Sequence, residues 1–339
     1  MRVFIAGGTG LIGRGLAKAL LDSGHQPIIL SRNADSVRRD REMWPYQVVA
    51  GDPTKPGRWQ DEVDGCDAVV NLAGHNIFAD RWNAEIKRKI RDSRVFSAEH
   101  LVHAIKNAHA RPKVYVQGSA VGFYGPEGDQ ELTESSPSGS DFLAVVCREC
   151  EDVSREFDQL GVRRAIVRTG IVLAANAGAL KIMTPIFKLG PGTPIGSGGG
   201  LVAKGDQWMS WIHLDDIVGI FKLTLEKDNA AGPLNGTAPH PVRNAEFAKT
   251  FSGVLKKPFT PWRIYLPFGP PDGMLRLVLG EVATVVTTGQ KVLPAKPLEL
   301  GYVFKYPYLA DALRAIFTAP PVQAPAVAHH HPAGAGAHH

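Results

Sequence analysis

The sequence predicts an α/β protein in which a doubly wound parallel sheet carries a smaller C-terminal lobe. Apolar, β-branched segments alternate with segments of helical spacing over residues 1–174. The strand-like segments are nearly continuous in apolar residues, as in a parallel sheet that helices cover on both faces. From about residue 175 the chain becomes rich in Gly and Pro, which is typical of a smaller and more irregular lobe.

The first predicted unit is a strand, a helix and a second strand. RVFIAGG is apolar and β-branched, GLAKALLDSG has helical spacing and ends at Gly24, and QPIILSR is apolar again. Further strands are expected at 68–74, 113–120 and 163–174, with helices between 82–108 and 141–159. We expect one domain from residues 1–174 and about 211–230, a smaller lobe from about 175–210 and 231–317, and a disordered Pro-, Ala- and His-rich tail at 318–339.

Composition places the chain among soluble globular proteins, with 44% hydrophobic and 21% charged residues. A net charge of +5 favours an anionic ligand but is too mild to indicate nucleic acid, and the basic run at 87–94 is better explained as a solvated helix face. No apolar run reaches the roughly 18 residues that span a bilayer, and three Cys fit a reducing compartment. We expect a cytoplasmic protein without a nucleic-acid, membrane or metal partner, and its oligomeric state is open.

The segment AGGTGLIG at 6–13 joins the first predicted strand to the first predicted helix. Glycines there let the backbone turn sharply and approach a pyrophosphate, while the helix N-terminus offers N–H groups and the positive end of its dipole. The alternative is a tight glycine turn without a ligand. We expect a Rossmann-type dinucleotide site that includes Gly7, Thr9, Gly10, Leu11, Ile12 and Gly13.

Two further strand ends are expected to complete the cofactor site. The second strand ends in Ser31 and Arg32, where an NAD site usually offers an acidic residue to the ribose hydroxyls. An arginine suits a 2′-phosphate, so the sequence favours NADP over NAD, unless Arg32 is only a solvated surface charge. At the end of a later strand, the backbone is expected to line the dinucleotide at Asn71, Leu72, Ala73 and Gly74.

The segments GGTGLIG, VVNLAG, GSAVGFYG and SWIHLDDIV together resemble the extended short-chain dehydrogenase/reductase superfamily. Segments at 78–95, 132–151, 168–174, 232–239, 280–294 and 300–307 make the chain similar to its atypical branch of "epimerase family proteins", which carry a C-terminal domain of unknown function. The resemblance extends from residue 1 to about 317. It implies an NADP(H)-binding oxidoreductase or epimerase-like enzyme whose small-molecule substrate lies between two lobes.

Ordinary members of this superfamily use a Tyr-x-x-x-Lys pair on a helix for proton transfer. No such pair occurs in this chain, and Leu143 and Cys147 stand at the corresponding positions. Because leucine cannot carry a proton, the usual mechanism is lost. Two hypotheses follow: an enzyme that uses other residues, or a catalytically inactive NADP-binding sensor or assembly protein.

The resemblance offers Ser119 and Tyr124 as substitutes. Ser119 follows a strand where the superfamily places a substrate-binding Ser or Thr, although the spacing to Tyr124 is one residue longer than in many relatives, which leaves Ala120 as the alternative counterpart. Tyr124 would donate a proton into the site unless it is a packing residue. Cys147 and Cys150 share a helix face, so a thiolate there is a further possibility. We interpret both cysteines as inert core residues, and His213 likewise as a core histidine.

Overall fold

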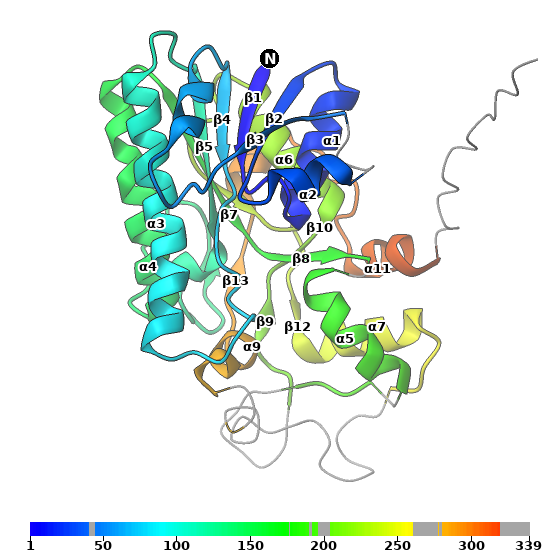
Figure 1. The fold of residues 1–339 in the computed structure, drawn as a ribbon. Helices are drawn as coiled ribbons and strands as arrows, with labels where there is room; N and C mark the ends of the chain where they lie inside the picture. The colour runs from blue at the N-terminus through cyan, green and yellow to red at the C-terminus, as the bar shows by residue number, and fades with distance from the viewer. Residues whose placement is uncertain are drawn as a thin grey trace, which may run out of the picture.

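The computed structural model describes residues 1–40, 45–175, 177–189, 192–195, 204–259, 277 and 280–318. Its central feature is a seven-stranded sheet with the strand order β11-β7-β5-β4-β1-β2-β3 (Figure 1). Every neighbouring pair in this sheet is parallel. The predicted Rossmann-type α/β fold is therefore confirmed.

The strands of the large sheet largely follow the predicted apolar segments. They are β1 (Arg2–Ala6), β2 (Gln26–Ser31), β3 (Gln47–Ala50), β4 (Ala68–Asn71), β5 (Val114–Ala120), β7 (Arg163–Thr169) and β11 (Gly232–Gly236). The single strand predicted at 163–174 is interrupted, because β8 (Ile171–Ala174) leaves the sheet and pairs with β10 (Trp211–His213). Gly170 marks the break, where a Cβ would lie 2.4 Å from the carbonyl oxygen of Ser210.

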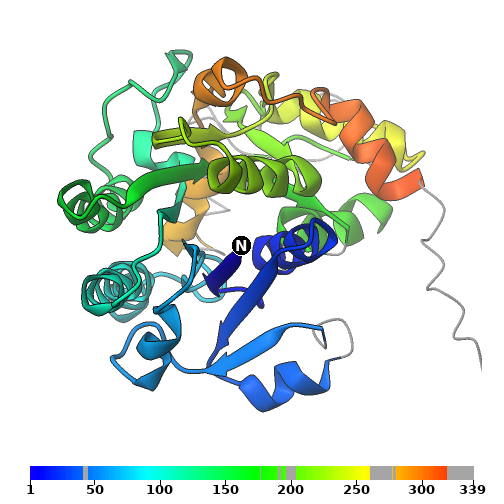
Figure 2. The same cartoon turned by 90° about the horizontal axis from the view of Figure 1, so that it is seen from above.

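Helices cover both faces of the sheet (Figure 2). On one face α1 (Leu11–Asp22) packs beside α6 (Leu214–Glu226), and on the other α3 (Ala84–Asn107) packs beside α4 (Phe142–Val153). Successive residues of β1 alternate between the two cores: Val3 and Ile5 join the core under α1 and α6, and Phe4 joins the core under α3. A short helix, α2 (Ala34–Arg39), follows β2.

The two long predicted helices begin at side-chain caps. Asn83 Oδ1 accepts a hydrogen bond from the N–H of Ile86 at 2.9 Å, and Asp141 Oδ1 accepts one from the N–H of Ala144 at 2.8 Å. After α4 the chain tightens into the 3₁₀ helix η4 (Ser154–Gln159), which completes the predicted helical stretch. Both caps hold the starts of α3 and α4 at the carboxyl edge of the sheet, where the site is expected.

Several elements lie beyond the carboxyl ends of the strands (Figure 1). They are α5 (Gly178–Leu189), α7 (Asn244–Val254), α9 (Ala283–Thr287) and α11 (Leu309–Thr318), with the short pairs β9 (Trp208–Met209) and β12 (Val242–Arg243), and β6 (Glu131–Leu132) and β13 (Lys291–Val292). The short helix α10 (Ala295–Glu299) instead packs against the edge strand β11. A separate apolar core centred on Trp211, Phe247 and Leu313 joins α7 and α11. We call α5, α7 and α11 with this core the smaller lobe.

One predicted boundary differs from the structure. Residues 232–236 were expected in the smaller lobe, but they form β11, which pairs with β7 as an edge strand of the large sheet. The segment GPLNG holds two Gly and one Pro and has no apolar run, so its pattern does not indicate a strand. The predicted tail lies outside the described residues after Thr318. Within the described part, no helix combines the length and the apolar character that crossing a membrane requires.

Candidate cofactor-binding and active site

The predicted site residues gather at one edge of the sheet. They lie at or after the carboxyl ends of β5, β4, β1 and β2, which are consecutive neighbours in the strand order. All these strands are parallel, so their carboxyl ends share the edge that faces the smaller lobe (Figure 1). Ligands of open α/β sheets bind outside this edge.

The segment that runs from the end of β1 into α1 has no room for a side chain at Gly7 or Gly13. Gly7 has a φ of +78°, and a Cβ there would lie 2.5 Å from the carbonyl carbon and oxygen of Leu72. A Cβ at Gly13 would lie 2.4 Å from the carbonyl oxygen of Gly7. Gly10 caps α1 without a side chain, so no capping group occupies the first N–H groups of the helix. These features fit the pyrophosphate of a dinucleotide.

Ser31 and Arg32 lie where β2 ends. Ser31 is buried, and its Oγ accepts a hydrogen bond from the N–H of Asn33 at 3.1 Å, which fixes the turn after the strand. The Arg32 side chain is exposed. An exposed guanidinium at this edge is free to meet a ligand phosphate, as the NADP hypothesis requires.

Asp52 is a neighbour of Arg32 that the sequence analysis missed. It follows β3, whose last residue, Ala50, lies opposite Ser31. Burial raises the pKa of Asp52, but hydrogen bonds from Thr54 and the charges of Arg32 and Lys55 outweigh that effect and hold it below the usual value. Its only sequence signal was an acidic residue two positions after β3, a strand whose exposed ends kept it from being recognised.

The side chain of Asn71 links the end of β4 to β5 and α3. Its side chain is fully buried, and its Nδ2 donates to Ser97 Oγ at 3.1 Å and to Gln117 Oε1 at 3.2 Å. Its Oδ1 accepts a hydrogen bond from the N–H of Ala73 at 3.1 Å. The side chain therefore shapes the turn after β4, and a cofactor contact from this segment would come from the backbone of residues 72–74.

Ser119 is tied to a buried ion pair. Its Oγ donates to Glu151 Oε1 at 2.7 Å. Arg168 holds the same carboxylate with two parallel bonds, Nε to Oε1 at 3.0 Å and Nη2 to Oε2 at 2.9 Å, and the two side chains are 6% and 7% exposed. The Ser119 proton is directed at Glu151 and the Cys147 thiol lies next to the same hydroxyl, so Oγ can still accept a hydrogen bond from a ligand hydroxyl on a remaining lone pair.

Tyr124 lies in the 3₁₀ helix η3 (Val121–Tyr124) and is fully buried. Its hydroxyl donates to Asn235 Oδ1 at 2.6 Å and accepts from Arg168 Nη1 at 3.0 Å. Burial raises the pKa of Tyr124, and Arg168 and Asn235 offset only part of that effect. The catalytic role of Tyr124 stays a prediction, and this burial favours the alternative of a packing tyrosine.

The positions of the missing Tyr-x-x-x-Lys pair lie on α4. Leu143 packs against Gly122, at which a Cβ would lie 3.4 Å from the Cβ of Leu143. Cys147 and Cys150 are buried free thiols. Burial, with the charge of Glu151, raises the pKa of Cys147 to about 11, and burial also raises the pKa of Cys150. Such neutral thiols are poor nucleophiles and poor bases near pH 7, in agreement with the prediction that they are inert.

His213 acts as a helix cap. It is 8% exposed, and its Nδ1 accepts a hydrogen bond from the N–H of Asp215 at 3.0 Å at the start of α6. Burial lowers the pKa of His213, although Asp215 and Asp216 act in the opposite direction. The neutral ring thus serves the fold, as predicted for a core histidine.

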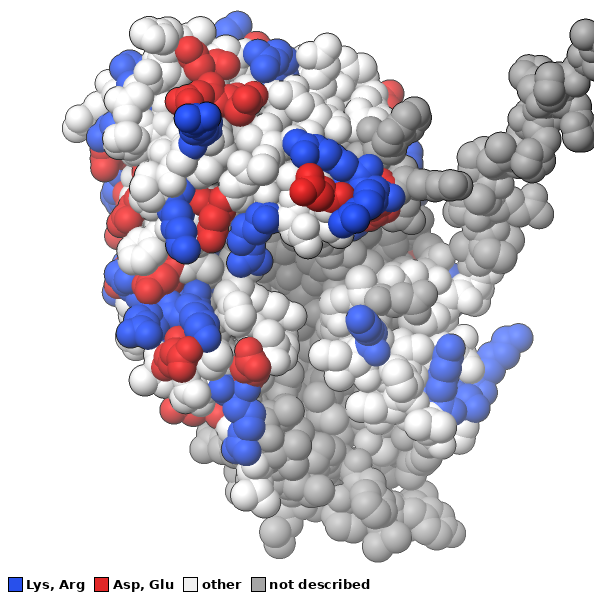
Figure 3. Space-filling model, in the orientation of Figure 1, with Lys and Arg blue, Asp and Glu red and all other residues white. Residues whose placement is uncertain are grey.

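The surface formed by α3 and α4 carries both positive and negative side chains (Figure 3). Figure 3 shows Lys and Arg interspersed with Asp and Glu over the α3–α4 side. Pairs such as Lys89–Glu85 and Arg91–Glu149, each at 2.6 Å, account for part of this pattern. The basic run at 87–94 is therefore largely a solvated face. Arg94 is the exception, because it lies on the side of α3 that faces the sheet.

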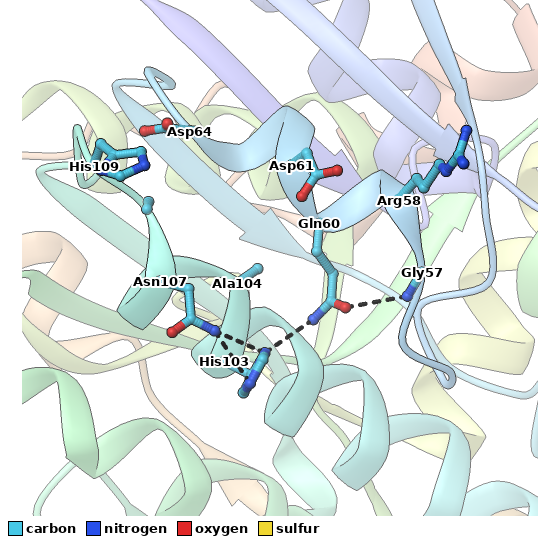
Figure 4. A pocket seen from close by; sticks show the side chains of 10 residues that line it. Gly57, Arg58, Gln60, Asp61, Asp64, His103, Ala104, Asn107 and His109 are labelled. Atoms are coloured by element: carbon cyan, nitrogen blue, oxygen red, sulfur yellow. Dashed lines mark hydrogen bonds between the residues drawn. The ribbon is translucent and has the colours of Figure 1, made fainter.

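Two hollows in the described part of the chain lie apart from the predicted site. One, of about 460 Å³, lies between η2 (Arg58–Val63) and the end of α3 (Figure 4). Gln60 crosses it and bonds to the N–H of Gly57 at 3.1 Å and to His103 Nδ1 at 3.4 Å. The other, of about 280 Å³, lies beside Trp208 and Arg243. None of the predicted site residues lines either hollow, so we assign neither a function.

The glycine cradle and the aligned strand ends define a Rossmann-type dinucleotide-binding protein. Residues 3–235 match the NAD dependent epimerase/dehydratase family, and residues 270–316 match a domain of unknown function, DUF1731. The chain belongs to this epimerase/dehydratase family. Both parts of the resemblance in the sequence, including the C-terminal domain of unknown function, are confirmed.

Named relatives narrow the similarity further. The chain is 42% identical over 320 residues to the chloroplastic "Epimerase family protein SDR39U1 homolog" of Arabidopsis thaliana, covering 93% of this chain and 86% of that protein. The structure of human epimerase family protein SDR39U1 with NADPH is similar at 34% identity and a TM-score of 0.78, over 94% of this chain and 100% of that one. A UDP-glucuronic acid 4-epimerase from Bacillus cereus shares the fold alone, at 16% identity, a TM-score of 0.71, and coverage of 94% and 98%. Because the plant relative is chloroplastic, the cytoplasmic location stays a prediction.

Proposed function

We propose that the protein is an NADP(H)-dependent oxidoreductase or epimerase-like enzyme that acts on a small, sugar-related molecule at the carboxyl edge of the sheet. The observation that carries this proposal is the glycine cradle, in which Gly7 and Gly13 have no room for a Cβ and the N-terminus of α1 has no side-chain cap. The similarity to a protein solved with NADPH supports the same cofactor class.

Arg32 supports NADP rather than NAD. Its guanidinium is exposed at the end of β2, and an arginine at this position suits a 2′-phosphate that NAD lacks. A charge-assisted hydrogen bond contributes about 1.5–3 kcal/mol, so Arg32→Ala should weaken NADPH binding by roughly 10- to 150-fold and leave NADH binding unchanged. The exposed Arg39 in α2 provides the matched control, Arg39→Ala, which should change neither affinity. Fluorescence titration measures both, and equal affinities for NADPH and NADH in the wild type would refute the preference.

The bound cofactor would supply or accept a hydride, and the chain must then handle a proton at the substrate oxygen. Ser119 is our candidate for this step: its proton is directed at Glu151, so its Oγ would accept a hydrogen bond from a substrate hydroxyl. When the substrate is oxidised, its hydroxyl proton passes to Ser119 Oγ as the serine proton passes to Glu151 Oε1; reduction reverses both transfers. Arg168 acts as a positioning residue that fixes the carboxylate.

Paired variants test this chemistry. Ser119→Ala should lower kcat on the substrate at least tenfold and leave NADPH affinity unchanged, since removal of a positioned proton-transfer group costs about 10²–10⁴-fold. Tyr124→Phe should instead retain turnover and lose about 1–3 kcal/mol of stability, because Asn235 and Arg168 lose a buried partner. The reverse result, with turnover lost only in Tyr124→Phe, would return the catalytic role to the tyrosine. Mass spectrometry of small molecules that copurify with the protein would supply the substrate.

The alternative is an NADP-binding protein without turnover. Leu143 and the neutral, buried Cys147 at the positions of the usual catalytic pair favour it. This alternative predicts that NADPH binds with the Arg32-dependent preference, while no candidate carbonyl or alcohol changes the absorbance of the reduced cofactor at 340 nm. A turnover that depends on Ser119 would eliminate it.

A further inference from the structure

An arginine occupies the sheet-facing stripe of α3. Ile90, one turn before Arg94, and Ala98, one turn after it, are both fully buried. Arg94 is partly buried among them, so its guanidinium reaches the carboxyl edge of the sheet rather than the helix surface. The basic composition of this segment did not distinguish Arg94 from its solvated neighbours.

The guanidinium of Arg94 uses only part of its donors. Nη1 donates to the carbonyl oxygens of His75 at 3.1 Å and Ile90 at 2.9 Å. In the part of the chain that the structure describes, Nε and Nη2 of Arg94 have no hydrogen-bond partner. The fully buried side-chain nitrogen and oxygen atoms without a partner in this part are His75 Nε2 and Gln207 Oε1, so Nε and Nη2 of Arg94 are not fully enclosed. These two open nitrogens form one edge of the guanidinium. Arg168 uses the same edge to hold the carboxylate of Glu151.

Gly74 lies against the flat face of the Arg94 guanidinium. A Cβ at Gly74 would lie 3.0 Å from Cζ, 3.1 Å from Nη2 and 3.3 Å from Nε, nearest the central carbon, so any side chain there would push the guanidinium away. Gly74 belongs to the backbone segment predicted to line the dinucleotide. The guanidinium, with its two open donors, therefore lies beside the segment where the ligand is predicted.

The positive charge of Arg94 has no acidic partner among the side chains that the structure describes. Among the described residues, no Asp or Glu lies within ion-pair distance of Arg94, whereas the equally inward-facing Arg168 has Glu151. Burial lowers the pKa of Arg94, and the charges that oppose this effect are those of Cys147 and Cys150, which exist only when these thiols are ionised. A partly buried cation without a counter-ion is destabilising unless an anion binds to it.

We propose that Arg94 is an anion-binding residue of this site and receives two carboxylate or phosphoryl oxygens on Nε and Nη2. The inference rests on the proposed function only in placing a ligand at this edge. Two sources have this chemistry: the pyrophosphate of the cofactor, and an acidic group on the substrate. A lysine at position 94 would retain the positive charge but not the two parallel donors of arginine, so it tests whether the geometry matters. The two sources of the anion are tested with separate ligands.

The test compares Arg94→Gln, Arg94→Lys and the matched control Arg88→Gln, whose arginine is exposed on the same helix. The first arm titrates NADPH and, separately, 2′,5′-ADP, which lacks a pyrophosphate. If the pyrophosphate is the ligand, Arg94→Gln should weaken NADPH at least tenfold and leave 2′,5′-ADP unchanged. The second arm titrates malonate and inorganic phosphate into NADPH-saturated protein and follows Tm. If the substrate supplies the anion, these probes should raise Tm in the wild type and in Arg88→Gln, with at least tenfold weaker apparent affinity in Arg94→Gln and an intermediate value in Arg94→Lys.

A folded Arg94→Gln variant that matches the wild type in both arms would overturn the proposal. Should Arg94→Gln fail to fold, Arg94→Lys decides, because loss of the fork alone should still weaken one of the two arms. Failure of wild-type protein to bind NADPH would refute the proposed function instead. Malonate and phosphate titrations without cofactor would then decide the role of Arg94 by themselves.

Discussion

Cys147 should react with iodoacetamide much more slowly than an ordinary thiol, although it lies in the middle of the predicted site. Burial and the charge of Glu151 raise the pKa of Cys147 to about 11, against which Arg94 acts only weakly. At pH 8 about 0.1% of such a thiol is ionised, compared with about 24% for a model thiol of pKa about 8.5, a difference of roughly 240-fold. The greater intrinsic nucleophilicity of a high-pKa thiolate restores about tenfold, which leaves a slowing of at least about 20-fold before steric protection is counted.

Alkylation followed by peptide mass spectrometry measures this rate for each cysteine separately. Glutathione under the same conditions is the reference, and protein unfolded in urea should lose the protection. The rate at Cys147 should rise about tenfold for each pH unit between 7 and 10, because the thiolate fraction does so. Labelling at the rate of glutathione, or a rate that levels off below pH 8, would refute the reasoning and restore the thiolate as a candidate acid/base. Cys147→Ser should leave NADPH affinity unchanged.

Three other variants test the cradle, the ion pair and the remaining thiol. Gly7→Ala should abolish NADPH binding in a fluorescence titration, because its Cβ would lie 2.5 Å from the carbonyl of Leu72, and a retained affinity would contradict the cradle. Glu151→Gln should lower the free energy of unfolding in urea by about 3–5 kcal/mol, because Arg168 loses its buried counter-ion; a loss below about 1 kcal/mol would contradict this. Burial raises the pKa of Cys66 from 9.0 to about 11, so the unfolded chain loses this proton first and stability should fall as pH rises from 9 to 11. Cys66→Ala should reduce that fall by up to about 3 kcal/mol, at about 1.36 kcal/mol per pKa unit, and an unchanged pH profile would argue against it.

The sequence predicted those strands that are buried on both faces. β1 and β4 are apolar along almost their whole length, and this pattern is visible locally. β3 is as short as β4 but has exposed ends, and β11 contains Gly and Pro, so neither shows the same pattern. Both lie at the outer ends of the strand order, where one side of the strand has no partner. The apolar pattern therefore did not predict the strands that are only partly buried.

The site was predictable where a motif is continuous in the chain and not where it depends on distant pairs. The glycine loop at 7–13 is a single segment whose requirements are local. The environment of Tyr124 depends on Asn235, 111 positions away, and on Arg168, 44 positions away. Sequence spacing alone does not show that these groups saturate the hydroxyl. Whether Tyr124 is exposed, and whether its hydroxyl can transfer a proton, therefore depends on contacts that exist only in the folded protein.

The structure shows how the helix that lost its catalytic pair is compensated. On α4, Leu143 packs against Gly122 and Cys147 is a neutral thiol, so neither position of the usual pair offers an acid/base group or a cation to the sheet edge. The positive charge comes instead from α3, where Arg94 turns inward beside Gly74. The polar oxygen comes from β5, where Ser119 is oriented by Glu151, a different residue of α4. Chemistry at this edge must therefore depend on Ser119, Glu151 and Arg94, and substitutions at Leu143 or Cys147 should alter stability without altering which ligands bind.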